Sequence, residues 1–576
     1  MRFSIQDDQF LLDGKPFQII SATVHYFRIV PGCWEDRLRK VRAMGCNTVE
    51  TYVPWNLHEP QHGVYDFSGR LDIVRFLKTV QSLGLYAIVR PSPFICAEWE
   101  FGGQPAWLLA GEEPIPVRTR EGEFLHLMDR YYGALFPLLA PLQIDAGGPI
   151  LMMQVENEYG AFGCDKEYLA EMGAIMRRHG ATVPFMTSDN YGYDLTRGTY
   201  EGALPTGNFG SGAAEKFDEL AKVNRGGPLM CAEFWDGWFD AWGDEAHHTT
   251  DAAVAARELD EVLRRGSVNL YMGCGGTNFG FTSGANYYEH LAPDVTSYDY
   301  DAPIAEDGSL TEKFHAFRKV IGQYTTLPEL DFPPVRRAAY GALTEVGCVD
   351  LRTALPRLST AHDLETPCGM ERLGQNFGYI LYRHTLQRDI ATLRLDSARD
   401  RVQVFADGKP VLTLYDLEIP GEHPLALPAG TCLELLVENM GRVNYGPHLN
   451  DQRKGIVSPV LADGEPLDGW QAFCLPLDDL SGLEFASAHP TESPAFHRFV
   501  LHLDAEPADT WLDYTGWGKG CAFVNGFALG RYWHVGPQRR LYLPGPLLHA
   551  GDNEIILFET DGPAVGEIVL TDAPAL

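Results

Sequence analysis

Apolar runs of strand length alternate with amphipathic segments over the first 330 residues. Short β-branched and apolar runs predict strands, and the segments with apolar residues every three or four positions predict helices. The predicted strands are 17–27, 46–53, 85–90, 150–155, 183–188, 199–208, 228–233 and 268–273, of which the sixth has the weakest pattern. The predicted helices are 34–44, 71–83, 123–142, 166–179, 213–223, 250–265 and 312–324.

Eight such units predict a TIM barrel, a closed (β/α)8 barrel, over residues 1–330. A doubly wound open sheet is the alternative arrangement of the same elements. It would bind its ligand at one switch point, whereas polar clusters here follow strands one, two, three, four, seven and eight. The barrel fits this pattern better, because chemistry in a barrel is spread over the carboxyl ends of many strands.

The pattern changes after Pro328. The segment 327–334 is rich in proline and predicts a linker. Short alternating runs follow and no long helical pattern remains, so we predict an all-β remainder. We divide it into a β-rich connector at 331–380, a first jelly-roll-like β-sandwich at 381–480 and a second at 481–576.

The all-β part contains a weak internal repeat with an offset of about 120 residues. It indicates that the two sandwiches arose by duplication; the alternative is that unrelated sandwiches share the same hairpin-turn chemistry. The matching features are 425–428 with 541–544, 433–438 with 555–559, and Gly408 with Gly526.

Composition excludes some classes of partner. The net charge of −32 argues against nucleic acid and anionic membrane surfaces as ligands. The first eight residues contain no apolar core of a signal peptide. Eleven cysteines occur without a CxxC pair, which is typical of reduced, buried thiols. We therefore expect a cytoplasmic protein.

Two of the predicted barrel strands end in glutamate. The fourth stops at Glu156-Asn157-Glu158 and the seventh at Glu233. A lone glutamate at a strand end is more often the partner of an arginine or lysine. The ends of strands four and seven, however, face each other across a barrel mouth, and a pair of carboxylates is what glycoside hydrolysis needs. Alternation does not choose between Glu156 and Glu158, because both lie on one face if the strand continues.

Six blocks then carry a resemblance to a known family. Together they resemble the β-galactosidases of glycoside hydrolase family 35, in the same order along the barrel. The blocks are TYVPWNLHEP (51–60), RPSPFICAEWEFGG (90–103), GGPILMMQVENEY (147–159), CAEFW (231–235), GGTNFG (275–280) and TSYDYDAP (296–303).

The resemblance implies a retaining enzyme that releases terminal, non-reducing β-galactose from an oligosaccharide or glycoconjugate. Glu158 would be the acid/base and Glu233 the nucleophile. The resemblance implies no cofactor and no metal, and suggests a homodimer. The family's galactose contacts would fall on Tyr52, Cys96, Ala97, Glu98, Asn157 and Tyr300, with Cys96 and Ala97 acting largely through their backbone, and less clearly on Tyr298.

The mechanism makes physical demands on the pair. The two carboxyl groups should lie about 5–5.5 Å apart, since direct attack leaves no room for water between them. We expect the charge of Glu233 to raise the pKa of Glu158 by repulsion, so that Glu158 keeps its proton and acts as the acid. Glu156 is then structural, and we expect a cationic or hydrogen-bonding partner for it.

Aromatic residues bear on specificity. Trp235 and Trp238 follow the predicted nucleophile, and Tyr445 lies in a loop of the first sandwich. Similar bacterial members use such residues to clamp the second sugar, which implies a preference for β-1,3-linked galactose on N-acetylhexosamine. The alternative is that these aromatics are core or interdomain packing. Two other functions stay open: a retaining exo-β-glycosidase for another sugar such as glucosamine, and a carbohydrate-binding protein without turnover.

The segment His58-Glu59-Pro60-Gln61-His62 matches the HExxH zinc pattern. That pattern needs a helix to bring both histidines to one face, and Pro60 breaks a helix at its centre. We therefore predict no metal site there, and we expect His247 and His248 to be solvated.

Overall fold

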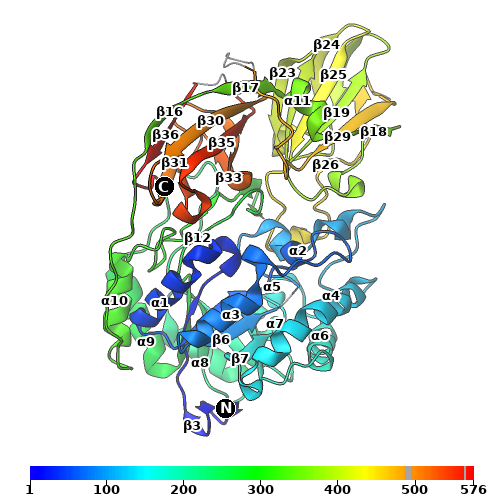
Figure 1. The fold of residues 1–576 in the computed structure, drawn as a ribbon. Helices are drawn as coiled ribbons and strands as arrows, with labels where there is room; N and C mark the ends of the chain where they lie inside the picture. The colour runs from blue at the N-terminus through cyan, green and yellow to red at the C-terminus, as the bar shows by residue number, and fades with distance from the viewer. Residues whose placement is uncertain (92, 487–493, 563–565) are drawn as a thin grey trace.

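The computed structural model describes residues 1–91, 93–486, 494–562 and 566–576. A barrel forms the lower half of the molecule in Figure 1, and two β-sandwiches lie side by side above it. The barrel has eight parallel strands and is closed by the pairing of β9 with β10. Its strands are β4 (Ile20–Thr23), β5 (Thr48–Tyr52), β6 (Tyr86–Arg90), β7 (Ile150–Gln154), β8 (Phe185–Asp189), β9 (Leu204–Asn208), β10 (Met230–Trp235) and β11 (Ser267–Tyr271).

Each of these strands lies within or overlaps a predicted strand, so the TIM barrel is confirmed and the open sheet is excluded. The helices agree as well, and two of them, α1 and α8, match to the residue. The helices are α1 (Trp34–Met44), α3 (Ile73–Ser82), α4 (Phe124–Leu139), α6 (Lys166–Arg178), α8 (Ala213–Val223), α9 (Ala252–Arg265) and α10 (Glu312–Ile321).

Short elements at both ends of the barrel were not predicted. A small sheet of β1 (Phe3–Gln6), β2 (Gln9–Leu12) and β3 (Lys15–Pro16) opens the chain. The remaining short helices follow barrel strands, and two hairpin-like strand pairs lie between β11 and α10. These elements are α2 (Trp55–His58), α5 (Tyr159–Phe162), α7 (Tyr193–Gly198), β12 (Gly276–Thr277), β13 (Ala285–Tyr287), β14 (Leu291–Pro293) and β15 (Ser297–Tyr298).

The first sandwich pairs a six-stranded sheet, β18-β29-β19-β25-β22-β23, with a four-stranded sheet, β24-β20-β27-β28. Two further short strands, β21 and β26, pair with each other. The bounds are β18 (Ala361–Leu364), β19 (Tyr379–Thr385), β20 (Ile390–Arg394), β21 (Ala398–Arg399), β22 (Arg401–Ala406), β23 (Lys409–Tyr415), β24 (Glu422–Leu427), β25 (Cys432–Glu438), β26 (Gly455–Ile456), β27 (Leu461–Ala462), β28 (Glu465–Pro466) and β29 (Trp470–Leu475).

The second sandwich pairs a five-stranded sheet, β17-β30-β35-β32-β33, with a four-stranded sheet, β16-β36-β31-β34. The bounds are β16 (Gly341–Thr344), β17 (Gly347–Asp350), β30 (Ala495–Leu503), β31 (Thr510–Asp513), β32 (Lys519–Val524), β33 (Phe527–Trp533), β34 (Arg540–Leu543), β35 (Gly551–Glu559) and β36 (Glu567–Thr571).

The two sandwiches repeat one topology. The order β19-β25-β22-β23 returns as β30-β35-β32-β33, and β24-β20-β27 returns as β34-β31-β36. The repeat seen in the sequence falls on equivalent strands, with 433–438 on β25 and 555–559 on β35. A shared strand order supports duplication over the alternative of shared turn chemistry alone.

The predicted connector at 331–380 forms no sheet of its own among the described residues. Its strands β16 and β17 are edge strands of the second sandwich, and β18 is an edge strand of the first. Between them lies a helix that we did not predict, α11 (Leu351–Leu358). The Asp350 carboxylate caps this helix by accepting the backbone N–H of Arg352 and Thr353.

The two large sheets pack against each other through a third apolar layer. Along β19, Ile380 and Tyr382 face the core of the first sandwich, whereas Tyr379 and Leu381 face the second sandwich. Such alternation buries both faces of the strand. The rings of Phe496 and Phe558 stack in this layer with centroids 4.5 Å apart, and Tyr379 meets Phe558 edge-on. The sandwiches therefore form one body.

No helix in the described ranges has the length and apolar character needed to cross a bilayer. The eleven cysteines are all free thiols.

Replacing Phe558 by alanine tests the layer between the sandwiches. Phe558 is fully buried, so we expect Phe558→Ala to cost about 3–5 kcal/mol of stability and to lower the melting temperature measured by calorimetry. Leu417→Ala is the control, because Leu417 is 63% exposed. A melting temperature equal to that of the control would contradict this account of the interface.

Candidate active site

A cavity of about 300 Å³ opens at the carboxyl ends of the barrel strands. It brings together every residue that we predicted for catalysis or substrate binding except Tyr298, the contact that the resemblance implied less clearly. These residues are Tyr52, Cys96, Ala97, Glu98, Asn157, Glu158, Glu233, Trp235, Trp238, Tyr300 and Tyr445. Five further lining residues were missed, namely Asn190, Phe239, Tyr271, Asn286 and Tyr288.

Glu233 is held by donors on both carboxylate oxygens. It lies in β10 where the register with both neighbouring strands shifts, and such a bulge re-aims side chains. Its Oε1 accepts hydrogen bonds from Tyr52 Oη at 2.9 Å and Arg90 Nη1 at 2.6 Å. Its Oε2 accepts one from Trp235 Nε1 at 3.2 Å. The carboxylate is therefore fixed in position and paired with a cation.

Arg90 was missed by the sequence analysis, although it is the polar residue that ends the third predicted strand. It is fully buried, and its Nε makes an ion pair with Glu50 Oε1 at 2.8 Å. Its Nη2 donates to the carbonyl oxygen of Ala232 at 2.8 Å. One guanidinium thus spans two buried carboxylates, and removing either partner would leave an uncompensated charge.

Glu158 has a different environment. It is 7% exposed, and its Oε1 accepts one hydrogen bond from Asn208 Nδ2 at 3.2 Å. Burial raises its pKa to about 8, and the negative charge of Glu233 adds to the shift. We predicted that repulsion would be the main cause of the raised pKa, but the larger cause is burial. Among the described contacts, this carboxyl has no cation of the kind that Glu233 has. Glu158 therefore carries a proton at neutral pH.

Glu156 points away from this chemistry. Its carboxylate accepts two hydrogen bonds from Arg118, both at 2.9 Å, and one from Tyr168 Oη at 3.0 Å. Such a fork-to-carboxylate pair is strong and directional. The expectation of a cationic or hydrogen-bonding partner for Glu156 is confirmed. The Arg118 guanidinium also fixes the backbone at Asn157, because its Nη2 donates to the Asn157 carbonyl oxygen at 2.6 Å.

The loop after β6 adopts an unusual backbone. Cys96, Ala97 and Glu98 have φ angles of 55°, 58° and 48°, in the left-handed region. Each such residue costs about 1–2 kcal/mol, so the surroundings must impose the conformation. The carbonyl oxygen of Ala97 accepts from Arg28 Nη2 at 2.5 Å, and that of Glu98 accepts from the backbone N–H of Gly284 at 2.9 Å. The loop is thus fixed before any substrate arrives.

Glu98 adds a third buried carboxyl to the cavity. Burial raises its pKa to about 7, while a hydrogen bond from Tyr298 Oη at 2.6 Å opposes the shift. Tyr298 does not line the cavity. It lies behind Glu98, against Tyr271 Oη at 3.1 Å and beneath the guanidinium of Arg28 at 3.7 Å.

The outer wall of the cavity is aromatic. Trp235 and Trp238 meet edge-on with centroids 5.8 Å apart, and Trp238 is 39% exposed. Tyr445 reaches the cavity from the first sandwich, and its Oη accepts a hydrogen bond from Asn190 Nδ2 at 3.0 Å. The sequence signal for Asn190 was its place directly after the fifth strand.

Arg442 fastens the loop that carries Tyr445. It is fully buried and makes ion pairs with Glu100 of the barrel and, at 2.5 Å, with Glu371 of the first sandwich. Its carbonyl oxygen accepts the backbone N–H of Ala285 at 3.1 Å. The sandwich is therefore part of the active-site wall.

The HExxH residues have unrelated partners. His58 ends α2, and its two ring nitrogens lie 2.5 Å from Tyr26 Oη and 2.7 Å from the carbonyl oxygen of Asp66. Glu59 accepts from Trp55 Nε1 at 2.7 Å. The helix ends before the second histidine of the pattern.

The expectation that His247 and His248 are solvated holds for His248, whose side chain is 48% exposed, and is wrong for His247, whose side chain is 17% exposed. Both rings contact Asp240. His247 Nδ1 lies 2.6 Å from Asp240 Oδ2, and His248 Nδ1 lies 2.8 Å from Asp240 Oδ1. Asp240 is buried, so it holds both rings against the barrel.

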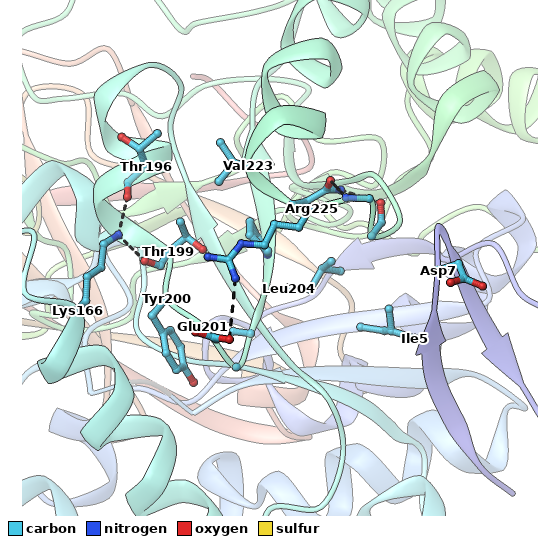
Figure 2. Close-up of a pocket in the computed structure, with 16 residues that line it drawn as sticks. Ile5, Asp7, Lys166, Thr196, Thr199, Tyr200, Glu201, Leu204, Val223 and Arg225 are labelled. Atoms are coloured by element: carbon cyan, nitrogen blue, oxygen red, sulfur yellow. Dashed lines mark hydrogen bonds and ion pairs between the residues drawn. The ribbon is translucent and has the colours of Figure 1, made fainter.

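A larger cavity, of about 900 Å³, lies at the opposite end of the barrel. It adjoins Leu204, which begins β9, and 223–227, which precede β10. Figure 2 shows Lys166 directed at the carbonyl oxygens of Thr196 and Thr199, and Arg225 directed at Glu201, 4.0 Å away. These cations are used in contacts within the protein, and the amino ends of barrel strands are the structural side of the fold.

Comparison with known proteins agrees with the geometry. The model described as "Glycosyl hydrolases family 35" matches residues 9–324. This chain belongs to glycosyl hydrolases family 35. It is a glycoside hydrolase, and hydrolysis of β-galactosides is the activity that the family supports. Models described as "Beta-galactosidase, first all-beta domain" and "Beta-galactosidase, galactose-binding domain" match residues 367–477 and 494–553.

Family 35 relatives match nearly the whole chain. "Beta-galactosidase" of Xanthomonas manihotis is 42% identical, over 94% of this chain and 91% of its own length. "Beta-galactosidase 17" of Arabidopsis thaliana is 40% identical, over 98% and 88%. "Beta-galactosidase-1-like protein 2" of Homo sapiens is 39% identical, over 98% and 91%.

The two causes that raise the pKa of Glu158, burial and the charge of Glu233, can be separated by experiment. In Glu233→Gln the like charge is gone but burial remains, so we expect the pKa of Glu158 to fall below 8 and to stay above its ordinary 4.5. Carbon-13 NMR of glutamate-labelled protein, titrated from pH 4 to 10, measures it. A return to the ordinary value would show that repulsion was the main cause after all.

Proposed function

We propose that this family 35 enzyme is a retaining exo-β-galactosidase with Glu158 as acid/base and Glu233 as nucleophile. The observation that carries the proposal is the contrast between the two carboxyls in one cavity. Glu233 is paired with Arg90, whereas Glu158 is buried, has no cation among its described contacts and has its pKa raised to about 8. Two carboxyls whose environments push their protonation apart are the arrangement that acid and nucleophile require.

The first step uses both groups. A Glu233 oxygen attacks the anomeric carbon as Glu158 donates its proton to the glycosidic oxygen, and the bond to the leaving sugar breaks. The glycosyl ester of Glu233 is neutral, so the pKa of Glu158 falls. In the second step Glu158 accepts a proton from water, whose oxygen attacks the anomeric carbon. Galactose leaves with its configuration retained, and Glu233 regains its charge.

The shape of the cavity supports action at the end of a chain. Arg90 and Glu50 are fully buried and close the barrel beneath it. The strained loop 96–98 forms one wall, and Tyr52, Asn157 and Tyr300 offer polar groups to a sugar. A cavity of about 300 Å³ with a closed floor suits a terminal galactose, with the rest of the substrate leaving through the aromatic mouth.

We further propose a preference for β-1,3-linked galactose on N-acetylhexosamine. Trp235, Trp238 and Tyr445 line the same cavity as the two glutamates, on its outer side. Aromatic faces stack on the apolar faces of sugar rings, so these three side chains would select the angle at which the second sugar leaves.

A cytoplasmic location is also proposed, and the free state of the eleven cysteines supports it.

Replacing each glutamate by glutamine tests the assignment. We expect Glu233→Gln to abolish turnover of nitrophenyl β-galactoside. Glu158→Gln should slow substrates with poor leaving groups by about 10²–10⁴-fold and affect nitrophenolate release much less. Glu167→Gln is the control, since Glu167 is exposed on α6. The assignment would be overturned by unchanged nitrophenyl β-galactoside hydrolysis in Glu233→Gln, or by unchanged hydrolysis of substrates with poor leaving groups in Glu158→Gln. A panel of nitrophenyl glycosides would reveal another sugar.

Removing the ring of Tyr445 tests the linkage preference. We expect Tyr445→Ala to reduce the ratio of kcat/KM for β-1,3 over β-1,4 and β-1,6 galactosyl disaccharides about tenfold. Tyr445→Phe should keep the ratio, because it retains the ring and loses only the bond to Asn190. Tyr193→Ala is a matched control with a side chain that is 85% exposed. An unchanged ratio in Tyr445→Ala would show that the ring only packs.

A further inference from the structure

A second cavity, of about 330 Å³, lies where the barrel loops meet both sandwiches. All three parts of the protein contribute to its lining. The residues that matter for its chemistry are Trp242, Asp244 and His290 of the barrel, Tyr415 and Asp416 of the first sandwich, and Trp533 of the second.

This cavity shares a wall with the active site. The β13–β14 hairpin pairs Asn286 with Ala292 and Tyr287 with Leu291. Asn286 and Tyr288 line the active-site cavity, whereas His290 to Pro293 line the second cavity. The segment after β10 does the same, with Trp238 and Phe239 on the first cavity and Ala241 to Asp244 on the second. The two cavities are therefore neighbours on the outer rim of the barrel.

The second cavity has an aromatic platform made by two domains. The rings of Tyr415 and Trp533 stack with centroids 5.5 Å apart and planes within 13° of each other. Trp242 stands beside Trp533, with centroids 6.4 Å apart. Tyr415 and Trp533 are each partly exposed. The stacked pair covers one face of each ring, and Lys519 and Arg401 lie over Trp533 and Tyr415 at 4.9 and 5.4 Å. The exposed ring edges and the ring of Trp242 therefore offer the apolar surface that the C–H groups of a pyranose can contact.

The charged groups that line the cavity are acidic. Asp244, Asp400 and Asp416 line it, together with no lysine or arginine among its described lining residues. Asp400 is occupied by Lys454, whose Nζ lies 2.6 and 2.7 Å from its two oxygens. Such a lining disfavours anionic ligands and favours neutral ligands with many hydroxyl groups.

Asp244 and Asp416 keep acceptor capacity for a ligand. One oxygen of Asp416 accepts the backbone N–H of Leu291 at 2.9 Å, and one oxygen of Asp244 accepts that of Ala241 at 2.7 Å. A carboxylate has about four acceptor sites, so each group can accept hydroxyl donors as well. Asp416 also has a φ of 34°, a left-handed conformation that the contact with the hairpin holds in place.

We propose that the second cavity binds a neutral sugar residue at the distal end of an oligosaccharide whose terminal galactose occupies the active site. The inference rests on the proposed function and extends its substrate class to chains longer than a disaccharide. The hairpin between the cavities is two strands wide, about 5 Å from strand to strand, so a substrate longer than a disaccharide is needed to reach over it. Aromatic contacts and carboxylate acceptors then bind the distal ring.

Chain length is the experimental variable. The substrates are nitrophenyl β-galactoside, a disaccharide of β-1,3-galactosyl-N-acetylglucosamine, and a neutral tetrasaccharide that ends in the same disaccharide. We expect the wild-type KM to be about tenfold lower for the tetrasaccharide than for the disaccharide. Trp533→Ala and Asp416→Asn should remove this advantage and leave the kinetics of the two shorter substrates unchanged. Leu417→Ala, next to Asp416 but not part of the lining, should keep it.

The outcomes separate the two proposals. A wild type that hydrolyses nitrophenyl β-galactoside but shows equal KM for both chain lengths overturns the inference and leaves the proposed function intact. A wild type that hydrolyses none of the three substrates overturns both. Asp416→Asn guards against a folding defect in Trp533→Ala, because an asparagine oxygen still accepts the Leu291 N–H. Equal losses on all three substrates in both variants would contradict a distal sugar site.

Discussion

The arrangement of the active site depends on one buried cation. Arg90 has no contact with solvent, and its guanidinium joins Glu50 on the inside of the barrel to Glu233 at its mouth. A buried charge without partners is too costly to keep, so the two carboxylates and the arginine hold one another in place. Tyr52 is drawn into the same group, because Arg90 Nη1 donates to its Oη at 2.6 Å.

The absence of such a cation at Glu158 is equally important. Both glutamates are nearly buried, yet only Glu233 has an arginine within hydrogen-bond distance among the described contacts. Arg118 reaches the backbone carbonyl of Asn157, the neighbour of Glu158, but its guanidinium binds the carboxylate of Glu156. The protein thus uses three glutamates in three ways, and the difference arises from where its arginines are placed rather than from the glutamates themselves.

Much of the barrel and of the candidate site could be predicted because the signals are local. Strand β7 is a short apolar run, and Glu158 and Glu233 directly follow or end such runs. Even the weak sixth strand forms, as β9. The features that the sequence analysis missed depend on partners that are distant in sequence, or belong to helices and strands too short to show a hydrophobic periodicity. Arg90 and Glu233 are 143 residues apart, and no spacing rule joins them.

Other elements were missed for similar reasons. Helix α7 has six residues, and α11 contains Pro356, which normally indicates a helix break; the Asp350 cap and the burial of Leu351 and Leu355 hold α11 instead. The strands of the predicted connector could not be assigned, because their partners lie more than a hundred residues further along the chain. The left-handed backbone at 96–98 could not be predicted either. Glycine is the residue that normally indicates this conformation, and none of these three positions is glycine.

The position of Tyr445 has a consequence for biosynthesis. The barrel residues leave the ribosome first, and they carry both glutamates and all the predicted galactose contacts. One wall of the cavity is still missing at that stage, because it comes from a loop more than a hundred residues beyond the end of α10. A nascent chain with a complete barrel therefore has its chemical groups assembled while its mouth is open. The linkage selectivity that we propose would then be acquired only when the first sandwich folds and Arg442 docks its loop against Glu100.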